Sequence, residues 1–324
     1  MKATLLVVLV GLLCCTNAAA QQRYPSKPIR VINITSAGGP TDIMARALGQ
    51  GFAQMNGQNF VVENRPGANS IIAAEACAKA APDGYTICLL PRNAISLNPY
   101  LYRKLPYDGE KSFEPITNLV WGQQVLVLHP SIPSNTFKEL VEYSKQHPNT
   151  INYASAGIGS NVHLTMELMK RQLGANFTHI PFKAAAEPPL AFERGDLHLM
   201  YLIIGIPGVM EQIRGGRAKP LFTSGDARSP LLPDVPLLAE VGFAKYDARN
   251  WFGMFAPTRT PKEIVEKLSA DIVSILSGQA FRDKILAPAG FEAIGGTPEE
   301  FAKSLAEDRK RGAELVRISG VRLD

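Results

Sequence analysis

The sequence predicts an α/β protein built as two lobes, and three observations support this prediction. Short apolar runs alternate with amphipathic segments, and this rhythm of strand and helix starts a second time in the middle of the chain. The 324 residues are enough for two ordinary domains. Apolar residues make up 46% of the chain and charged residues only 19%, so the chain can bury cores and intrinsic disorder is disfavoured.

The first group of elements has the order strand, helix, strand, helix, strand. We expect strands over residues 29–34, 59–63 and 85–90, and helices over residues 41–54 and 71–80. In the first of these helices, Ile43, Ala47 and Leu48 fall on one face. Such an alternation predicts a parallel sheet covered by helices.

The second group repeats this alternation. We expect strands over residues 125–129, 151–154, 179–182, 197–204 and 219–223, and helices over residues 136–147, 161–173 and 207–214. Residues 261–278 are amphipathic, because apolar side chains recur there every four residues. The last helix starts at a capping box, in which Thr297 precedes Pro298 and Glu300.

The first twenty residues have the layout of a secretory signal peptide. Lys2 supplies a positive charge, Leu5–Cys15 is an apolar run too short to span a bilayer, and small residues follow up to Ala20. We therefore expect export to the periplasm with cleavage near Ala20. An uncleaved anchor, a buried strand and, less favoured, a lipoprotein are the alternatives.

Removal of residues 1–20 would leave two cysteines, Cys77 and Cys88. Two cysteines can form neither a disulfide scaffold nor a four-ligand zinc site. They could pair in an oxidising compartment, but Cys77 lies in an Ala-rich helical stretch and Cys88 in a strand-like run. We therefore favour two small buried side chains with free thiols.

The net charge of +5 is spread along the chain without a run of Lys or Arg, so we expect no nucleic-acid partner. The sequence contains no G-x-S-x-G, H-E-x-x-H or P-loop motif, and its five histidines lack metal-ligand spacing. We expect no enzyme activity, metal or cofactor. An exported hydrolase using Ser155 or Ser160 with His163 is an alternative, because catalytic groups need not be close in sequence.

A glycine-containing turn lies between the first predicted strand and the first predicted helix. Its residues are Ser36, Ala37, Gly38, Gly39, Pro40, Thr41 and Asp42. The two glycines allow a tight turn with unobstructed amides, and Pro40 suits the first turn of a helix. Free N–H groups and the helix dipole favour an anion there. The alternative is an ordinary turn capped by Asp42.

A second glycine turn lies between a strand and a helix in the second group. It runs through Ser155, Gly157, Gly159 and Ser160 to His163, with Ser160 near the helix N-cap. The serine hydroxyls add donors, so the two turns together suit an anion held between the lobes. For His163 we slightly favour helix packing or an i,i+4 pair with Glu167 over ligand binding.

Eight segments of the sequence resemble the Bug-type solute receptors of tripartite tricarboxylate transporters. They are Tyr24–Arg30, Gly38–Asp42, Val62–Ala68, Ala81–Thr86, Asn98–Tyr102, Leu105–Asp108, Arg228–Leu237 and Trp251–Pro257. The segments cover nearly the whole mature chain in order. The resemblance implies a type II-like, two-lobed periplasmic binding protein (a Venus flytrap), with each lobe a mixed sheet flanked by helices and two crossings between the lobes.

The resemblance also implies the lobe limits, ligand and partner. One lobe would hold residues 21–122 plus 250–324, and the other residues 123–249. An organic carboxylate, such as a dicarboxylate or an aromatic acid, would be held at the first turn, partly through waters. Its distal group would lie near the second turn and the Lys183, Ala184 and Ala185 loop. A membrane permease would be the partner of a monomeric receptor; a receptor kinase that reads the same clamp is the alternative.

The sequence departs from the family pattern at several residues that are expected to lie near the ligand. Thr35 stands where the family has an aromatic residue, which opens space, and Ala184 stands where it has a glycine. Arg92 and Asn93 follow the third strand, where small residues are usual. Arg92 would point a bidentate donor toward the cleft or be an exposed loop residue. We hypothesise that Arg92 and Thr35 retune the pocket for a bulkier or more anionic carboxylate.

Overall fold

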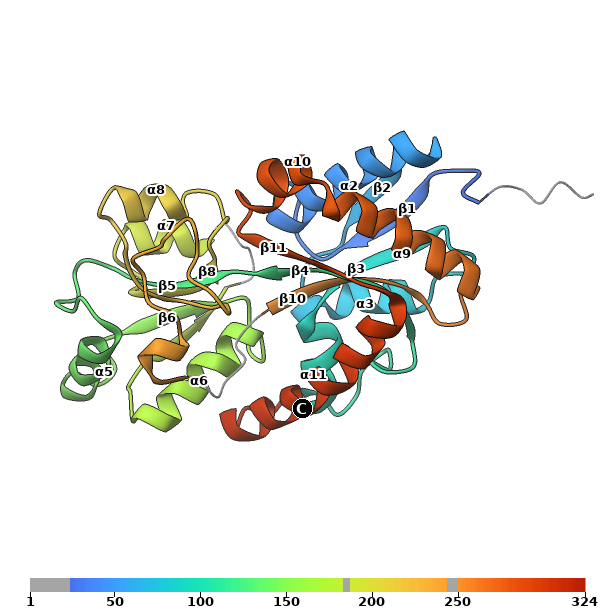
Figure 1. Ribbon diagram of the computed structural model, residues 1–324. Helices are drawn as coiled ribbons and strands as arrows, with labels where there is room; N and C mark the ends of the chain where they lie inside the picture. The colour runs from blue at the N-terminus through green and yellow to red at the C-terminus, as the bar shows by residue number, and fades with distance from the viewer. Residues whose placement is uncertain (1–23, 183–186, 244–249, 324) are drawn as a thin grey trace, which may run out of the picture.

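The computed structural model describes residues 24–182, 187–243 and 250–323. These residues form two α/β lobes that lie side by side, each with its own sheet (Figure 1). The expected signal peptide, residues 1–20, and the expected ligand contacts Lys183, Ala184 and Ala185 lie outside the described residues. Among the described residues, no helix combines the length and the apolar character that crossing a membrane requires.

The first lobe contains a six-stranded sheet with the order β11-β4-β10-β3-β1-β2. Its strands are β1 (Ile29–Asn33), β2 (Phe60–Asn64), β3 (Thr86–Pro91), β4 (Phe113–Gly122), β10 (Asn250–Pro257) and β11 (Phe291–Gly295). β1 pairs in parallel with β2 and β3, whereas β10 is antiparallel to β3 and β4. The three strands of the predicted alternation are therefore parallel, as expected, and the antiparallel β10 makes the whole sheet mixed, as the resemblance implied.

The second lobe contains a five-stranded sheet with the order β7-β6-β8-β5-β9. Its strands are β5 (Gln124–Leu128), β6 (Asn152–Ser155), β7 (Thr178–Pro181), β8 (Leu199–Ile203) and β9 (Lys219–Thr223). β6 is parallel to β7 and β8, and β5 is antiparallel to β8 and β9. All five strands had been predicted, with boundaries within about two residues.

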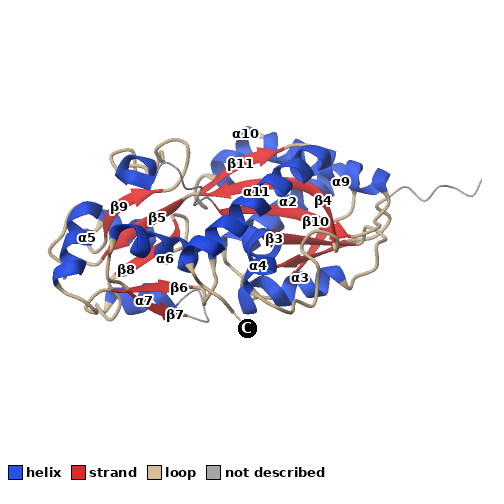
Figure 2. Ribbon diagram, turned by 90° about the horizontal axis from the view of Figure 1, so that it is seen from below, coloured by secondary structure: helices blue, strands red, loops and turns tan. Residues whose placement is uncertain are grey.

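The helices flank both sheets (Figure 2). They are α2 (Pro40–Asn56), α3 (Ile71–Ala78), α4 (Asn98–Leu101), α5 (Phe137–Gln146), α6 (Asn161–Leu173), α7 (Glu187–Glu193), α8 (Val209–Arg214), α9 (Lys262–Ser277), α10 (Gln279–Phe281) and α11 (Pro298–Ser319). The capping box predicted for the last helix is confirmed, since Thr297 and Glu300 satisfy each other's backbone N–H groups.

The chain passes between the two sheets twice. Gln123 alone separates β4 from β5, and the chain returns between Phe243 and Asn250. The Gln123 N–H donates to Gly290 of the first lobe, and its side chain accepts from Ser229 of the second. The two crossings confirm the expected connectivity, whereas the precise lobe limits stay a prediction.

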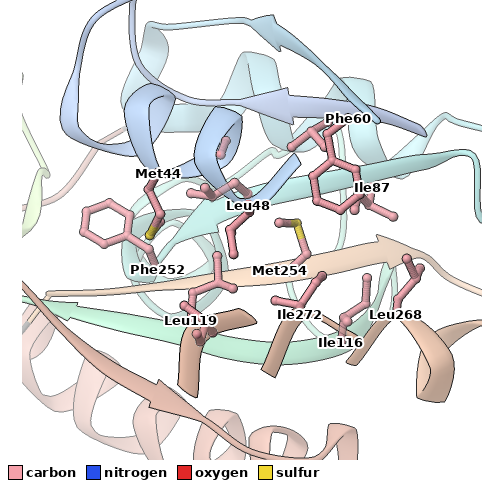
Figure 3. Packing of buried hydrophobic residues seen from close by; sticks show 14 of the residues in the cluster. Met44, Leu48, Phe60, Ile87, Ile116, Leu119, Phe252, Met254, Leu268 and Ile272 are labelled. Atoms are coloured by element: carbon pink, nitrogen blue, oxygen red, sulfur yellow. The ribbon is translucent and has the colours of Figure 1, made fainter. Parts of the chain in front are cut away.

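The core of the first lobe lies between the sheet and the helices α2 and α9 (Figure 3). It is built from Met44, Leu48, Phe60, Ile87, Ile116, Leu119, Phe252, Met254, Leu268 and Ile272, all at most 5% exposed. A second cluster, with α3 and α11, covers the opposite face of the sheet. Apolar packing on both faces makes this sheet a rigid support for the loops at its edges.

Cys77 and Cys88 form a disulfide, so the prediction of two free thiols was wrong. Both side chains are fully buried, and their Cα atoms are 6.0 Å apart. α3 packs against β3 and brings the two residues to a separation that suits a disulfide. The sequence pattern correctly assigned Cys77 to a helix and Cys88 to a strand, but it did not predict that this helix packs against this strand.

Candidate ligand-binding site

The first glycine turn joins β1 to α2, as predicted. Gly38 has a φ of +79°, which favours glycine. A Cβ at Gly39 would lie 3.0 Å from the Thr35 hydroxyl, so this position has little room for a side chain. Thr35 Oγ1 is also 2.8 Å from Thr41 Oγ1. The Thr35 hydroxyl therefore lies against Gly39, contacts Thr41 and stabilises the turn.

The amides of this turn are not all unobstructed, which corrects the sequence interpretation. The Gly38 N–H donates to Asp42 Oδ2 at 3.0 Å, and the Gly39 N–H donates to the Ser36 carbonyl. Asp42 is only 3% exposed. It caps the turn, as the alternative interpretation had it. The N–H groups of Thr41 and Asp42, in the first turn of α2, have no carbonyl four residues earlier within the helix.

Asp42 carries a negative charge beneath the turn. Burial raises the pKa of this carboxyl, but hydrogen bonds from Arg46, the Gly38 amide and Asn64 outweigh burial and lower it. Arg46 Nη2 lies 2.9 Å from Asp42 Oδ1. The ion pair offsets the charge that would otherwise repel an anion at the start of α2.

The second glycine turn joins β6 to α6, also as predicted. Gly157 and Gly159 have φ values of +121° and +80°. Ser160 is the N-cap of α6, and its hydroxyl accepts from the His163 N–H. The Gly157 N–H donates to Ser155 Oγ at 3.1 Å, and the Gly159 N–H donates to His163 Nδ1 at 3.0 Å. Side chains of the protein therefore engage these two amides as well.

His163 is a buried packing residue, 7% exposed, and its ring stacks on His179 with the centroids 4.0 Å apart. Burial lowers the pKa of His163, and burial together with the positive charge of a protonated His163 lowers the pKa of His179 to about 4. Glu167 binds the Tyr153 hydroxyl and Lys170. Both imidazoles are therefore neutral at neutral pH.

The loops at the carboxyl ends of the first-lobe strands meet the second glycine turn. β1, β2 and β3 are parallel, so the first turn, the 65–70 segment and the 92–93 segment share one edge of the sheet. From this edge, Asn69 Nδ2 donates to the Ile158 carbonyl at 3.2 Å. The carboxyl ends of β1–β3 and of β6 therefore face each other. Within the described part of the chain, no hydrogen bond joins the two glycine turns directly.

Arg92 differs from both sequence alternatives, because it is neither exposed nor open to a cleft. Its side chain is 1% exposed and forms an ion pair with Asp308 on α11, with Nη2 2.9 Å from Oδ1. Its Nη1 donates to Asn161 Oδ1 at 3.4 Å. Asn93, also buried, donates to the Asn69 side chain at 3.1 Å. Both residues support neighbouring chain segments.

The remaining predicted contacts divide by exposure. Ser36, Ala37 and Gly38 are exposed, whereas Thr41, Ser155 and Ser160 are buried. In the described ranges, no three His, Cys, Asp or Glu side chains gather in an arrangement that could hold a metal ion.

Sequence reasoning missed Asn69, His179 and Asp308. His179 was placed at the start of a predicted strand, but its register opposite Tyr153, two residues before Ser155, is visible only in the structure.

The chain matches the model of the tripartite tricarboxylate transporter family receptor over residues 44–321. The chain belongs to this family. It is 30% identical to Protein BugT of Bordetella pertussis over the full length of both chains. It is also similar to the solved structure of the periplasmic binding protein BugD, with 32% identity, a TM-score of 0.82 and coverage of 92% of this chain and 99% of that one.

Two further solved structures of similar receptors contain a carboxylate. One is Rpa4515 of R. palustris with adipate, which is 28% identical with a TM-score of 0.85, covering 92% of this chain and 99% of that one. The other is MatC of Rhodopseudomonas palustris with bound malate, which is 29% identical with a TM-score of 0.80, covering 90% and 100%. The family consists of solute receptors of transporters, and this chain has their fold.

Proposed function

We propose that this protein is a periplasmic receptor that captures an organic carboxylate between its two lobes and delivers it to a tripartite tricarboxylate-type permease. The observation that carries the proposal is the meeting of the two strand edges, where Asn69 reaches the turn that starts α6. In a receptor of this family, a ligand bound at these edges would contact both lobes. The adipate and malate in two similar receptors support a dicarboxylate.

We assign the ligand's carboxylates to the starts of α2 and α6. N–H groups in the first turn of a helix, with the helix dipole, stabilise an anion without a cationic side chain. In this assignment, the Thr41 N–H supplies a donor in the first lobe and the Ile158 N–H supplies one in the second, because the N–H groups of Gly159 and Ser160 already donate within the protein. Because Asp308 already neutralises Arg92, the earlier hypothesis that Arg92 selects a more anionic ligand loses its main support.

A hydrolase is the rival function, because Ser155 Oγ lies 2.6 Å from His179 Nε2. Three features disfavour it. Ser155 is 5% exposed, and its hydroxyl also contacts the backbone of Gly157. The pKa of about 4 makes His179 a weak base at neutral pH. The contact between Ser155 and His179 therefore stabilises the conformation of the turn. We propose that the protein binds its ligand without hydrolysing it.

A thermal-shift screen of the mature protein tests the proposal. Adipate, malate, succinate and benzoate would be compared, with adipamide as a control that keeps the shape of adipate but lacks its charge. A ligand present at 100 times its Kd stabilises the native state by about 2.7 kcal/mol, which raises Tm by roughly 5–10 °C. A shift with a carboxylate and none with the diamide supports the proposal, and equal responses to both contradict it.

Uptake measurements test the delivery step. Cells that lack the gene should lose uptake of the carboxylate that binds the purified protein. If binding is confirmed and uptake continues unchanged, the receptor does not deliver its ligand to a permease, and a role in sensing would replace the transport proposal.

A further inference from the structure

An unusual backbone segment precedes α3. Ala68, Asn69 and Ser70 are three consecutive residues other than glycine with positive φ, at 47°, 55° and 68°. L-residues rarely adopt this left-handed region, and each such residue carries a free-energy cost that its surroundings must offset. Strain of this kind persists where neighbouring contacts hold the backbone in place.

Asn69 is held from its own lobe on two sides. The buried Asn98 donates to the Asn69 carbonyl at 3.0 Å, and Asn93 donates to the Asn69 side-chain oxygen at 3.1 Å. These two bonds orient the amide group so that its Nδ2 donates across the junction to the Ile158 carbonyl. The strained segment thus presents one directed donor to the second lobe.

Arg92 makes a second contact across the junction, and it is also held from its own lobe. Asp308 accepts from Arg92 Nε at 3.2 Å and from Trp251 Nε1 at 2.8 Å, which anchors the guanidinium to β10 and α11. Arg92 Nη1 then reaches Asn161, the first residue of α6. All four residues, Arg92, Asp308, Trp251 and Asn161, are buried.

The two contacts lie on either side of Gly159. A Cβ at this glycine would lie 2.8 Å from Leu323 and 3.0 Å from Leu101, both residues of the first lobe. First-lobe side chains therefore lie against the second turn at Gly159. α6 and α11 also pack against each other at the junction of the lobes (Figure 1).

We propose that Asn69 and Arg92 form an interlobe latch, which we define as Asn69 with the Ile158 carbonyl and Arg92 with Asn161. The latch positions the second glycine turn and holds the lobes together; its side chains are positioning residues and do not themselves grip the ligand. This inference rests on the proposed function in one respect only, which is that the second glycine turn binds the ligand.

Hydrogen exchange on the ligand-free mature protein tests the latch. Asn69→Asp keeps the size of the side chain and its tolerance of positive φ, but it replaces the Nδ2 donor with a carboxylate oxygen facing the Ile158 carbonyl. Asn149→Asp is the matched control, because Asn149 has a φ of 61° and is exposed in the second lobe. The latch predicts that amides of residues 157–163 exchange about fivefold faster in Asn69→Asp than in the control.

Two further variants keep the test decisive. Asn69→Gly relieves the backbone strain and removes the donor, so it should fold well and still speed exchange at residues 157–163. Asn161→Ala should have the same effect from the opposite side of the junction. Unchanged exchange in Asn69→Gly and Asn161→Ala would overturn the latch. Because no ligand is present, failure of the carboxylate screen would refute the proposed function and leave this result standing.

Discussion

Asp308→Asn is the substitution that most sharply tests how the first lobe supports the site. The Asp308 side chain is 8% exposed and accepts from the buried Trp251 and Arg92 side chains. The amide keeps the shape but removes the negative charge, so a fully buried guanidinium would face a neutral neighbour. Removing one partner of a buried ion pair destabilises a protein by about 3–5 kcal/mol. The amide oxygen can still accept one hydrogen bond, so we expect the lower end, about 3 kcal/mol.

Urea unfolding measures this loss. The fluorescence of Trp251 reports on the first lobe in a Trp121→Phe background, because the chain has only these two tryptophans. Glu314→Gln is the control, since Glu314 lies on the same helix and pairs with Arg317 at the surface. Exposed pairs of this kind contribute little. A loss for Asp308→Asn no greater than that for Glu314→Gln would refute the reasoning.

Three other predictions concern the disulfide, the histidine pair and the second turn. Cys77→Ala with Cys88→Ala should lower the free energy of unfolding by about 3 kcal/mol in chemical denaturation, as the loop length implies; an unchanged midpoint would contradict this. Because the pKa of His179 is lowered to about 4 in the folded state, the unfolded chain binds more protons between pH 4 and 6.5. Stability should therefore fall as pH falls through this window, and the fall should be smaller in His179→Phe. Gly159→Ala should lower Tm more than Gly157→Ala, since only the former Cβ meets first-lobe side chains.

Elements with a clear hydrophobic period could be predicted from the sequence, and the centre of the large sheet could not. α6 and β9 have the predicted boundaries. β4 and β10 were not predicted, because Pro115 interrupts the apolar pattern of one and Gly253 that of the other. A Cβ at Gly253 would lie 2.4 Å from Phe301, so this glycine serves the packing of α11. That reason becomes visible only in three dimensions.

The two glycine turns of the candidate site could also be predicted, but their partners could not. A strand, a glycine turn and a helix N-cap are local patterns, so Gly38 and Ser160 were recognised correctly as turn and cap residues. The ion pair of Arg92 with Asp308 joins residues 216 positions apart. No local pattern indicates such a pairing, and it changes Arg92 from an expected ligand contact into a buried support.

The most direct test of the central claim is hydrogen exchange of the mature protein with and without the carboxylate that stabilises it most in the screen. Binding between the lobes predicts slower exchange in residues 36–43 of the first lobe and in residues 157–163 of the second, both saturating at the same ligand concentration. Protection confined to one lobe, or to a segment distant from both turns, would contradict a ligand held between the two helix starts.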